Sequence, residues 1–132
     1  MPGEWYLDRR TKTLFFYPPS PTQALGVYVP TLQNIIQLDG AAHIEFRGIT
    51  FECCEGTAIE LKNATKCLIA GCTIRNVGDY SGMGVSIQGG LENGVLGCDI
   101  SEVGNHGINL AGGDRITLTP AGNYAENNYI HH

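Results

Sequence analysis

The chain has 132 residues, of which 18 are Gly, about twice the share found in an average protein. Only 16% of the residues are charged, and the net charge is −5. This composition is too apolar for a disordered tail, no apolar run approaches the length of a membrane helix, and the Gly residues lack the strict period of collagen. With 8 Lys and Arg residues, a nucleic-acid groove is not expected either. We therefore expect one domain that binds neither nucleic acid nor a membrane.

Residues 1–34 predict a β-hairpin followed by a lead-in to the main body. Residues 4–8 and 13–17 are short apolar segments on either side of a polar turn, which is typical of two antiparallel strands. The aromatic residues of this segment form a small core in one interpretation and stack on sugar rings in another. They are Trp5, Tyr6, Phe15, Phe16 and Tyr17. Val27 and Val29 lead onward, and we expect the hairpin to flank or cap the part of the chain that follows.

Residues 35–132 consist of repeats. Four similar segments start 23, 26 and 30 residues apart, and each has an apolar residue at every second position with a Gly or Asn in the middle. They are residues 43–51, 66–74, 92–100 and 122–130. A second kind of short apolar segment occupies residues 36–38, 59–61, 85–87 and 108–110. Alternation with a period of two predicts β-strands with one buried face.

Repeats of this length with two or three short strands predict an all-β fold, a parallel β-helix (solenoid) of about four to five coils. A propeller blade is longer, and the Leu and Asn consensus of a leucine-rich repeat is absent. One coil per repeat places each strand about 4.8 Å above its predecessor, so equivalent side chains stack inside as ladders. We expect one ladder of Ile36, Ile59, Val85 and Ile108 and another of Leu38, Leu61, Ile87 and Leu110.

Gly and Asn residues have separate expected roles in such coils. Gly48, Gly71 and Gly97 fall where the chain turns between strands, and a positive φ at these corners favours Gly. Inward Asn side chains can hydrogen-bond from coil to coil, so we expect the Asn residues of the later repeats to serve the fold. These are Asn93, Asn123, Asn127 and Asn128.

The 5 Cys residues predict buried thiols. Their number is odd, and their spacing matches no zinc motif. Cys72 and Cys98 share an inward column with Ile49 and Asn128, which brings the two sulfur atoms into contact range. A disulfide between them satisfies the geometry, but stacked free thiols are the interpretation that we favour.

Several segments, inside and outside the repeats, carry a family resemblance. These are residues 3–8, 13–19, 29–30, 44–51 and 127–132. Together they resemble bacterial right-handed parallel β-helix repeat proteins of the pectate-lyase-like group. The resemblance implies a polysaccharide lyase or glycoside hydrolase for an acidic or plant or algal polysaccharide, in a secreted or periplasmic protein. Because residues 127–132 normally begin a coil in that group, we expect a fragment of a longer β-helix protein, without a complete active site by itself.

Residues 104–110 are similar to the Gly-His-Gly stretch of polygalacturonases, which share this fold. The similarity implies that His106 lies at the edge of a substrate groove, near catalytic acids for which Asp79, Asp99 and Glu102 are the candidates. Hydrolysis with inversion needs an acid and a base about 6.5–9.5 Å apart. Asp79 stands alone where polygalacturonases have paired Asp residues. The alternative role of His106 is that of a turn residue bonded to a neighbouring backbone group.

Four further residues are candidates for substrate binding, partly because the longest insertion between strands shapes the wall of a groove. They are Tyr80, Asn105, Asp114 and Arg115. A lyase also needs a group that neutralises a uronate, commonly Ca²⁺ or Arg. Asp99, Glu102 and Asp114 near Arg115 form a hypothetical calcium site, and in the alternative interpretation they are solvated acids. No other cofactor is expected.

A non-enzymatic module is the competing hypothesis. An open end of a solenoid exposes strand edges and apolar side chains, so copies of the chain would associate through that end. The apolar residues expected there are Leu110, Ile116, Leu118 and Ile130. The enzyme hypothesis requires two acids, or an acid and a base, to converge on one outer face near His106. Acids that are spread over different faces would contradict it.

Overall fold

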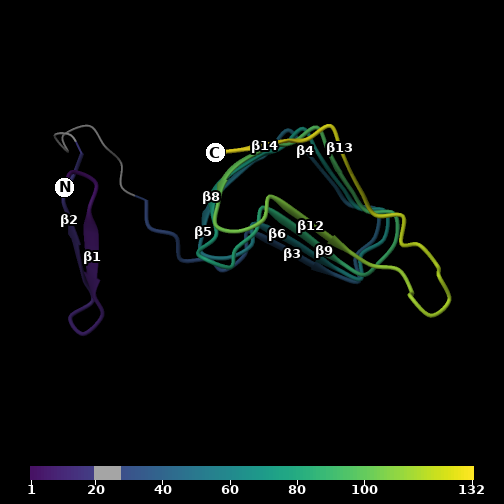
Figure 1. Cartoon of the computed structure of the whole chain (residues 1–132), viewed down its shortest axis with the longest axis horizontal. Coiled ribbons are helices and arrows are strands. Elements are labelled where there is room, and N and C mark those ends of the chain that lie inside the picture. Colours follow the sequence, from purple (N-terminus) through teal and green to yellow (C-terminus); the bar gives the residue numbers. More distant parts are fainter. Residues whose placement is uncertain (20–27) are drawn as a thin grey trace.

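The computed structural model describes residues 1–19 and 28–132, and this part of the chain contains β-strands and no helix (Figure 1). Three parallel sheets of four strands each enclose one hydrophobic core, and a two-stranded antiparallel sheet precedes them. Each coil takes one strand from each parallel sheet, so four coils are stacked. The all-β parallel solenoid predicted from the repeats is therefore confirmed. None of the described residues belongs to a helix long and apolar enough to cross a membrane.

The three parallel sheets follow one another around each coil. The first sheet contains β3 (Ile36–Asp39), β6 (Ile59–Lys62), β9 (Val85–Gln88) and β12 (Ile108–Ala111). The second sheet contains β4 (Glu45–Arg47), β7 (Leu68–Ala70), β10 (Gly94–Leu96) and β13 (Tyr124–Glu126). The third sheet contains β5 (Thr50–Cys54), β8 (Thr73–Val77), β11 (Asp99–Val103) and β14 (Tyr129–His131). Neighbours within each sheet are therefore strands of successive coils.

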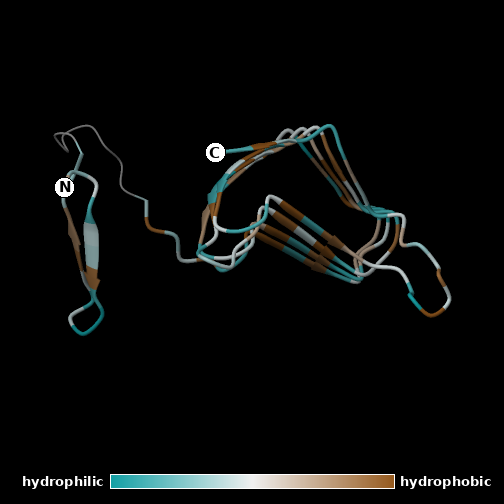
Figure 2. Ribbon diagram, viewed as in Figure 1, coloured by the Kyte–Doolittle hydropathy of each residue, from teal (hydrophilic) through white to brown (hydrophobic). Residues whose placement is uncertain are grey.

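The register between coils confirms both aliphatic ladders. Ile59 pairs with Ile36 on one side and with Val85 on the other, and Val85 pairs with Ile108. The second ladder runs in the same register two residues further along each strand. Ladder members in the two middle coils are at most 1% exposed. Figure 2 shows hydrophobic residues at the same places in successive coils, as this stacking requires.

One corner of every coil has a left-handed backbone. Gly48, Gly71 and Gly97 have φ values of 63°, 58° and 61°, and Asn127 takes the equivalent position in the last coil with a φ of 52°. Asn tolerates this conformation better than most residues with a side chain, which explains its place there. The N–H of Gly71 donates to the carbonyl of Leu96 in the next coil at 2.9 Å. The expected corner glycines are thus confirmed.

Inward Asn side chains bind successive coils together. Asn93 is 0% exposed, its Oδ1 accepts from the N–H of Cys67 at 3.0 Å, and its Nδ2 donates to the carbonyl of Ala64 at 2.8 Å. Asn128 acts in the same way one coil later, where its Oδ1 accepts from the N–H of Cys98 at 2.8 Å. Buried backbone groups need such partners wherever strand pairing is interrupted. The expected role of inward Asn side chains is therefore confirmed for Asn93 and Asn128, whereas Asn127 is exposed at its left-handed corner and does not point inward.

All five Cys residues are free thiols. Cys72 and Cys98 are each 1% exposed and occupy equivalent inward positions, because the N–H of Asp99 donates to the carbonyl of Cys72 at 2.9 Å. Burial raises the pKa of the Cys98 thiol. Ile49 begins the same column and is 42% exposed. Free thiols, rather than a disulfide, therefore continue this column through the middle coils.

The N-terminal hairpin forms as predicted, with β1 (Trp5–Asp8) and β2 (Thr13–Phe16) paired antiparallel. In its turn, Asp8 Oδ1 accepts from the N–H of Arg10 at 2.9 Å. The hairpin lies to one side of the coils in Figure 1. Val27, one of the two expected lead-in residues, lies outside the described residues. The role of the hairpin as a cap for the first coil stays a prediction.

A Leu-to-Ala change tests the ladders. Leu61 is 1% exposed and has ladder neighbours on both sides, so its truncation leaves a cavity between fixed coils. We expect Leu61→Ala to lower the free energy of unfolding by about 2–5 kcal/mol in urea denaturation. Leu32→Ala is the matched control, because Leu32 is 59% exposed. That control should change the free energy by no more than about 0.5 kcal/mol. Equal effects of both changes would contradict the core position of Leu61.

Candidate functional site

The outer face of the third sheet carries a row of polar side chains that crosses successive coils. Alternation turns Ile74 and its equivalents into the core, so the next residue of each strand points outward. The parallel register then aligns Glu52 with Arg75, Arg75 with Ser101, and Ser101 with His131. Arg75 Nε lies 2.8 Å from Glu52 Oε2, which forms an ion pair between the first two coils. Each coil thus contributes one polar side chain to the row.

A hydrogen-bonded His–Asp pair lies at one end of this row. His131 Nε2 is 2.9 Å from Asp99 Oδ1, and the two side chains are 33% and 55% exposed. The ring of Tyr129 stacks on the imidazole, with 4.2 Å between ring centroids and 24° between the planes. The register explains the geometry, because Asp99 pairs with Tyr129 while Ser101 pairs with His131. His131 therefore lies diagonally across from Asp99 on the same face.

Asp79 and Tyr80 lie in the turn between β8 and β9. Asp79 Oδ1 accepts hydrogen bonds from the backbone N–H of Ser81 at 3.0 Å and from its hydroxyl at 3.1 Å. These two bonds lower the pKa of the Asp79 carboxyl. Tyr80 is 94% exposed. The Asp79 carboxylate therefore closes its own turn, and its catalytic role stays a prediction.

His106 and Asn105 lie in the turn between β11 and β12, which stacks directly on the preceding turn. A Cβ on Gly104 would overlap the carbonyl oxygen of Asp79, so this close approach requires Gly. The N–H of Gly84 donates to the carbonyl of His106 at 3.0 Å, which agrees with the turn interpretation of His106. Both side chains are exposed, and within the described residues neither forms a hydrogen bond. They are accessible to a ligand but are not held in place.

Asp114 and Arg115 lie in the loop of residues 112–120 between β12 and β13, which projects away from the third sheet in Figure 1. Asp114 Oδ1 accepts from the N–H groups of Ile116 at 2.8 Å and Thr117 at 3.3 Å. These bonds lower the pKa of the Asp114 carboxyl. Like Asp79, this acid stabilises the local turn in which it lies.

The expected cluster of Asp99, Glu102 and Asp114 around Arg115 is not formed. Asp99 and Glu102 belong to β11 of the third sheet, whereas Asp114 and Arg115 belong to the loop between the other two sheets. In residues 1–19 and 28–132, no three His, Cys, Asp or Glu side chains are grouped so as to hold a metal ion. The calcium hypothesis therefore gains no support from these residues.

The stacked coils have a counterpart among known protein families. Residues 34–132 match the family described as the right handed beta helix region, and the match includes all four coils but not the N-terminal hairpin. The chain belongs to this family. Searches of curated proteins and of solved structures gave no match. Family membership agrees with the resemblance seen in the sequence and fixes the fold, while the reaction has to be argued from the site.

Tyr129 and His131 belong to this candidate site but are not among the catalytic and substrate-binding residues predicted from the sequence. The repeats contain a signal for both residues. The last repeat aligns Tyr129 with Asp99, and alternation places Tyr129 and His131 on one outward face. Among the predicted residues, Asp99 contacts His131 at 2.9 Å, and Glu102 directly follows Ser101, the register partner of His131. Asp99 and His131 thus lie on one face of the β-helix, in direct contact and not at the separation of about 6.5–9.5 Å that inverting hydrolysis needs.

The Asp99 carboxylate raises the pKa of His131 above its ordinary value. The hydrogen bond to Asp99 is the largest cause, the carbonyl of His132 adds to it, and the charges of Asp99 and Glu102 favour the imidazolium further. A His that is held by a carboxylate is oriented for proton transfer. The pair can therefore accept or release a proton at the surface of the β-helix.

Removing the Asp99 charge tests this coupling. In Asp99→Asn the pKa of His131 should fall toward the ordinary His value of about 6.5, measured by NMR titration of the imidazole. Asp79→Asn is the matched control, because Asp79 lies in the β8–β9 turn, and it should leave the pKa of His131 unchanged. An unchanged pKa in both variants would contradict the contact.

The same contact has a pH-dependent effect on stability. Because the pKa of His131 is raised in the folded chain, the contact stabilises the fold below the ordinary His pKa. Its contribution is lost as the pH rises through the folded-state pKa. Urea denaturation should therefore show that Asp99→Asn destabilises the chain more at about pH 5 than at about pH 9.

Proposed function

We propose that this β-helix chain is carbohydrate-active and binds a polysaccharide across the outer face of its third sheet. The observation that carries the proposal is the 2.9 Å contact between Asp99 and His131 beside the ring of Tyr129, which is 64% exposed. Carboxylate and imidazole groups hydrogen-bond hydroxyls, and an aromatic ring packs against the apolar face of a sugar. These three groups therefore suit one sugar unit.

The polar row of the third sheet supports a polymer rather than a single sugar as the ligand. Glu52, Arg75, Ser101 and His131 occupy one position in successive coils, and neighbouring coils are about 4.8 Å apart. A polymer that lies along the axis of the solenoid meets a polar side chain at every coil. Its affinity is then the sum of contacts from several coils, with Tyr129 and His131 at one end.

His131 is the proposed proton acceptor. Both reactions implied by the fold resemblance need a base, which takes a proton from water in hydrolysis or from a sugar carbon in lyase elimination, and the imidazolium then returns this proton to the departing glycosidic oxygen. Asp99 is a positioning residue in this proposal, because it accepts a hydrogen bond from Nε2 and stabilises the imidazolium that forms when Nδ1, 3.3 Å from the carbonyl oxygen of His132, takes up the proton. The role of His131 is thus common to both reactions.

The charges around the pair favour a neutral polysaccharide. Asp99 and Glu102 are carboxylates, and Arg75, the permanent cation of the same row, is already paired with Glu52. With a net charge of −5, the chain also repels a polyuronate at longer range. We therefore place neutral plant or algal polymers, which can be hydrolysed but not cleaved by elimination, ahead of the acidic polymers that the fold resemblance implies and on which a lyase acts.

Affinity electrophoresis in gels that contain dissolved polysaccharide tests the binding face. We expect the chain to be retarded by a neutral polymer such as xylan or laminarin and less by polygalacturonate. Tyr129→Ala should weaken binding about tenfold, since a stacked ring contributes about 0.5–1.5 kcal/mol beyond its buried area. Tyr28→Ala is the matched control, because Tyr28 is 81% exposed and precedes the first coil, and it should bind like the unaltered chain.

Product analysis separates the two reactions. New reducing ends without unsaturated sugars indicate a hydrolase, and unsaturated ends indicate a lyase. His131→Gln should abolish either product, because an amide cannot accept the proton. Binding without either product would remove the catalytic role of His131 and keep the binding role. Absence of binding to every polymer would contradict the proposal and favour the alternative of a non-enzymatic, self-associating module.

A further inference from the structure

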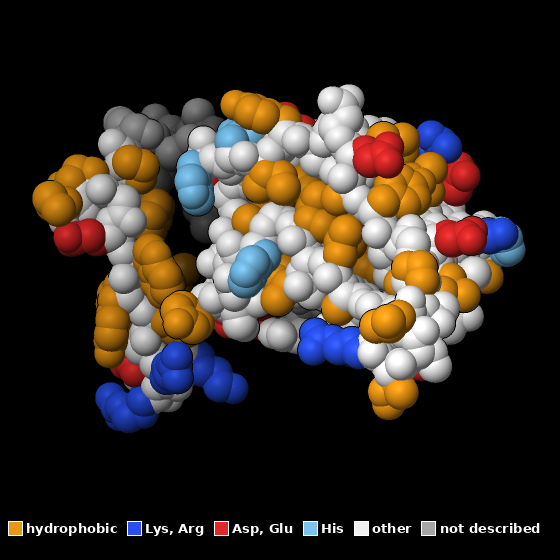
Figure 3. Space-filling model, turned by 45° about the vertical axis from the view of Figure 1, so that its right-hand side comes forward, with side chains coloured by type: hydrophobic (Ala, Val, Ile, Leu, Met, Phe, Trp, Pro, Cys, Tyr) orange, Lys and Arg blue, Asp and Glu red, His pale blue; other side chains and the backbone are white. Residues whose placement is uncertain are grey.

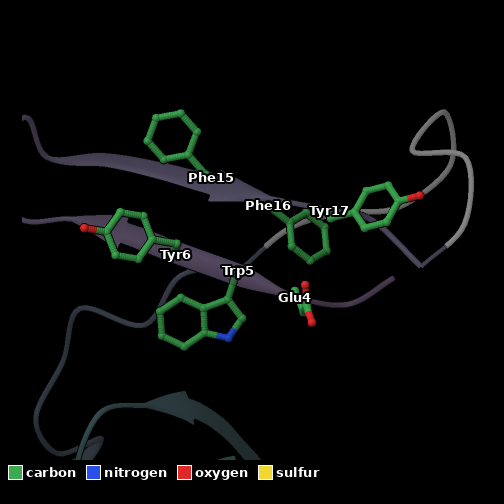
Figure 4. Close-up of a pocket in the computed structure, with 6 residues that line it drawn as sticks. All are labelled: Glu4, Trp5, Tyr6, Phe15, Phe16 and Tyr17. Atoms are coloured by element: carbon green, nitrogen blue, oxygen red, sulfur yellow. The ribbon is translucent and has the colours of Figure 1, made fainter. Parts of the chain in front are cut away.

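One face of the N-terminal hairpin is apolar and exposed. The pairs Trp5–Phe16 and Leu7–Leu14 place these four side chains on the same face, where they are 41–69% exposed. Figure 4 shows further aromatic side chains on both strands. A two-stranded hairpin is at best marginally stable alone in water, so an apolar face of this size needs a partner.

This hairpin face forms one wall of an open groove of about 570 Å³, and Figure 3 shows the hollow between the hairpin and the coils. Tyr28, Val29 and Pro30 line the groove from the other side. Lys12 and Glu55 add one positive and one negative side chain to its lining. The groove is thus apolar along its length, with opposite charges at its border.

The loop of residues 112–120 is an apolar projection with a defined shape. Asp114 and Thr119 exchange two backbone hydrogen bonds of 2.9 and 3.1 Å, and Asp114 also holds the N–H of Ile116. Ile116 and Leu118 are nevertheless 94% and 84% exposed. Leu118 has a φ of 56°, a strained conformation for a residue without a polar side chain. The loop therefore holds two aliphatic side chains in water, although this requires an unfavourable backbone conformation at Leu118.

We propose that the loop 112–120 of one molecule inserts Ile116 and Leu118 into the hairpin groove of a second copy of this chain. The charges are complementary as well as the apolar surfaces. Asp114 and Arg115 precede Ile116 in the loop, and the groove offers Lys12 and Glu55 to them. Within the described residues, Lys12 and Arg115 take part in no other ion pair. Such pairs contribute mainly to orientation and specificity.

The two halves of this contact lie at opposite sides of the molecule, with the hairpin at one side of the coils and the loop at the other (Figure 1). A molecule therefore cannot fill its own groove, and the contact joins different surfaces of two copies. A contact of this kind leaves a free loop and a free groove at the ends of each dimer, so association continues head to tail. This mode does not use the polysaccharide face. It uses Ile116 and Leu118, which were expected at the open end, but it pairs them with the hairpin groove of the second copy and not with another end coil.

Sedimentation velocity with two complementary variants tests the contact. The loop variant Ile116→Asp/Leu118→Asp and the groove variant Leu14→Asp should each remain monomeric, while the mean mass of the unaltered chain rises with concentration. An equimolar mixture of the two variants should form a one-to-one dimer and grow no further, because only one loop and one groove stay intact. Tyr80→Asp, an equally exposed site outside the contact, should associate like the unaltered chain.

A charge exchange gives a second measurement that does not depend on the apolar variants. Arg115→Glu should weaken association about tenfold, and adding Glu55→Arg should restore it, since the two charges are then reversed together. Circular dichroism identifies any variant that has lost its strands. The proposal is overturned by an unaltered chain that stays monomeric, by a loop variant that associates normally, or by a mixture of variants that grows beyond a dimer.

Discussion

Backbone hydrogen bonding from coil to coil in a fixed register is the constraint on which this structure depends. Each strand finds its partner one coil away, so equivalent residues of all coils share a column. A column is either inward and apolar or outward and polar, and a slip of one residue would exchange the two. Left-handed corners such as Gly97 and buried amides such as Asn93 secure the register where the strands are interrupted.

The candidate site is a product of the same register. No single coil contains it, because Asp99 belongs to the third coil and His131 to the fourth. The ion pair of Arg75 with Glu52 is likewise made between two coils. Groups of interacting side chains in this fold therefore run parallel to the solenoid axis, where a long ligand can follow them.

The repeat period of the sequence predicts the features that recur at equivalent positions of successive coils. These are both aliphatic ladders, the buried thiols and the glycine corners. It does not predict what happens where the period is interrupted. Asp79 and Asp114 were attractive as chemical acids, but both lie in insertions, where nearby N–H groups lack strand partners and bind the carboxylates instead. Asp99 is expected from the sequence to lie near His106, whereas its column leads to Tyr129 and, diagonally, to His131. Asp99 is thus a residue that the sequence predicts for the site, but its contact with His131 follows from the strand register and not from the expected position beside His106.

The insertions have a consequence for how such a chain diverges. The β8–β9 turn lengthens its coil, yet Val77 still pairs with Val103 and Val85 with Ile108. The loop 112–120 does the same one corner later, where Ala111 pairs with Gln88 and Tyr124 with Gly94. The extra residues form a loop that projects from one corner, and the register of the strands that follow is unchanged. Insertions and deletions can therefore accumulate at corners during evolution while the cross-section of the solenoid persists. The same corners are natural places to graft a foreign peptide onto a rigid support.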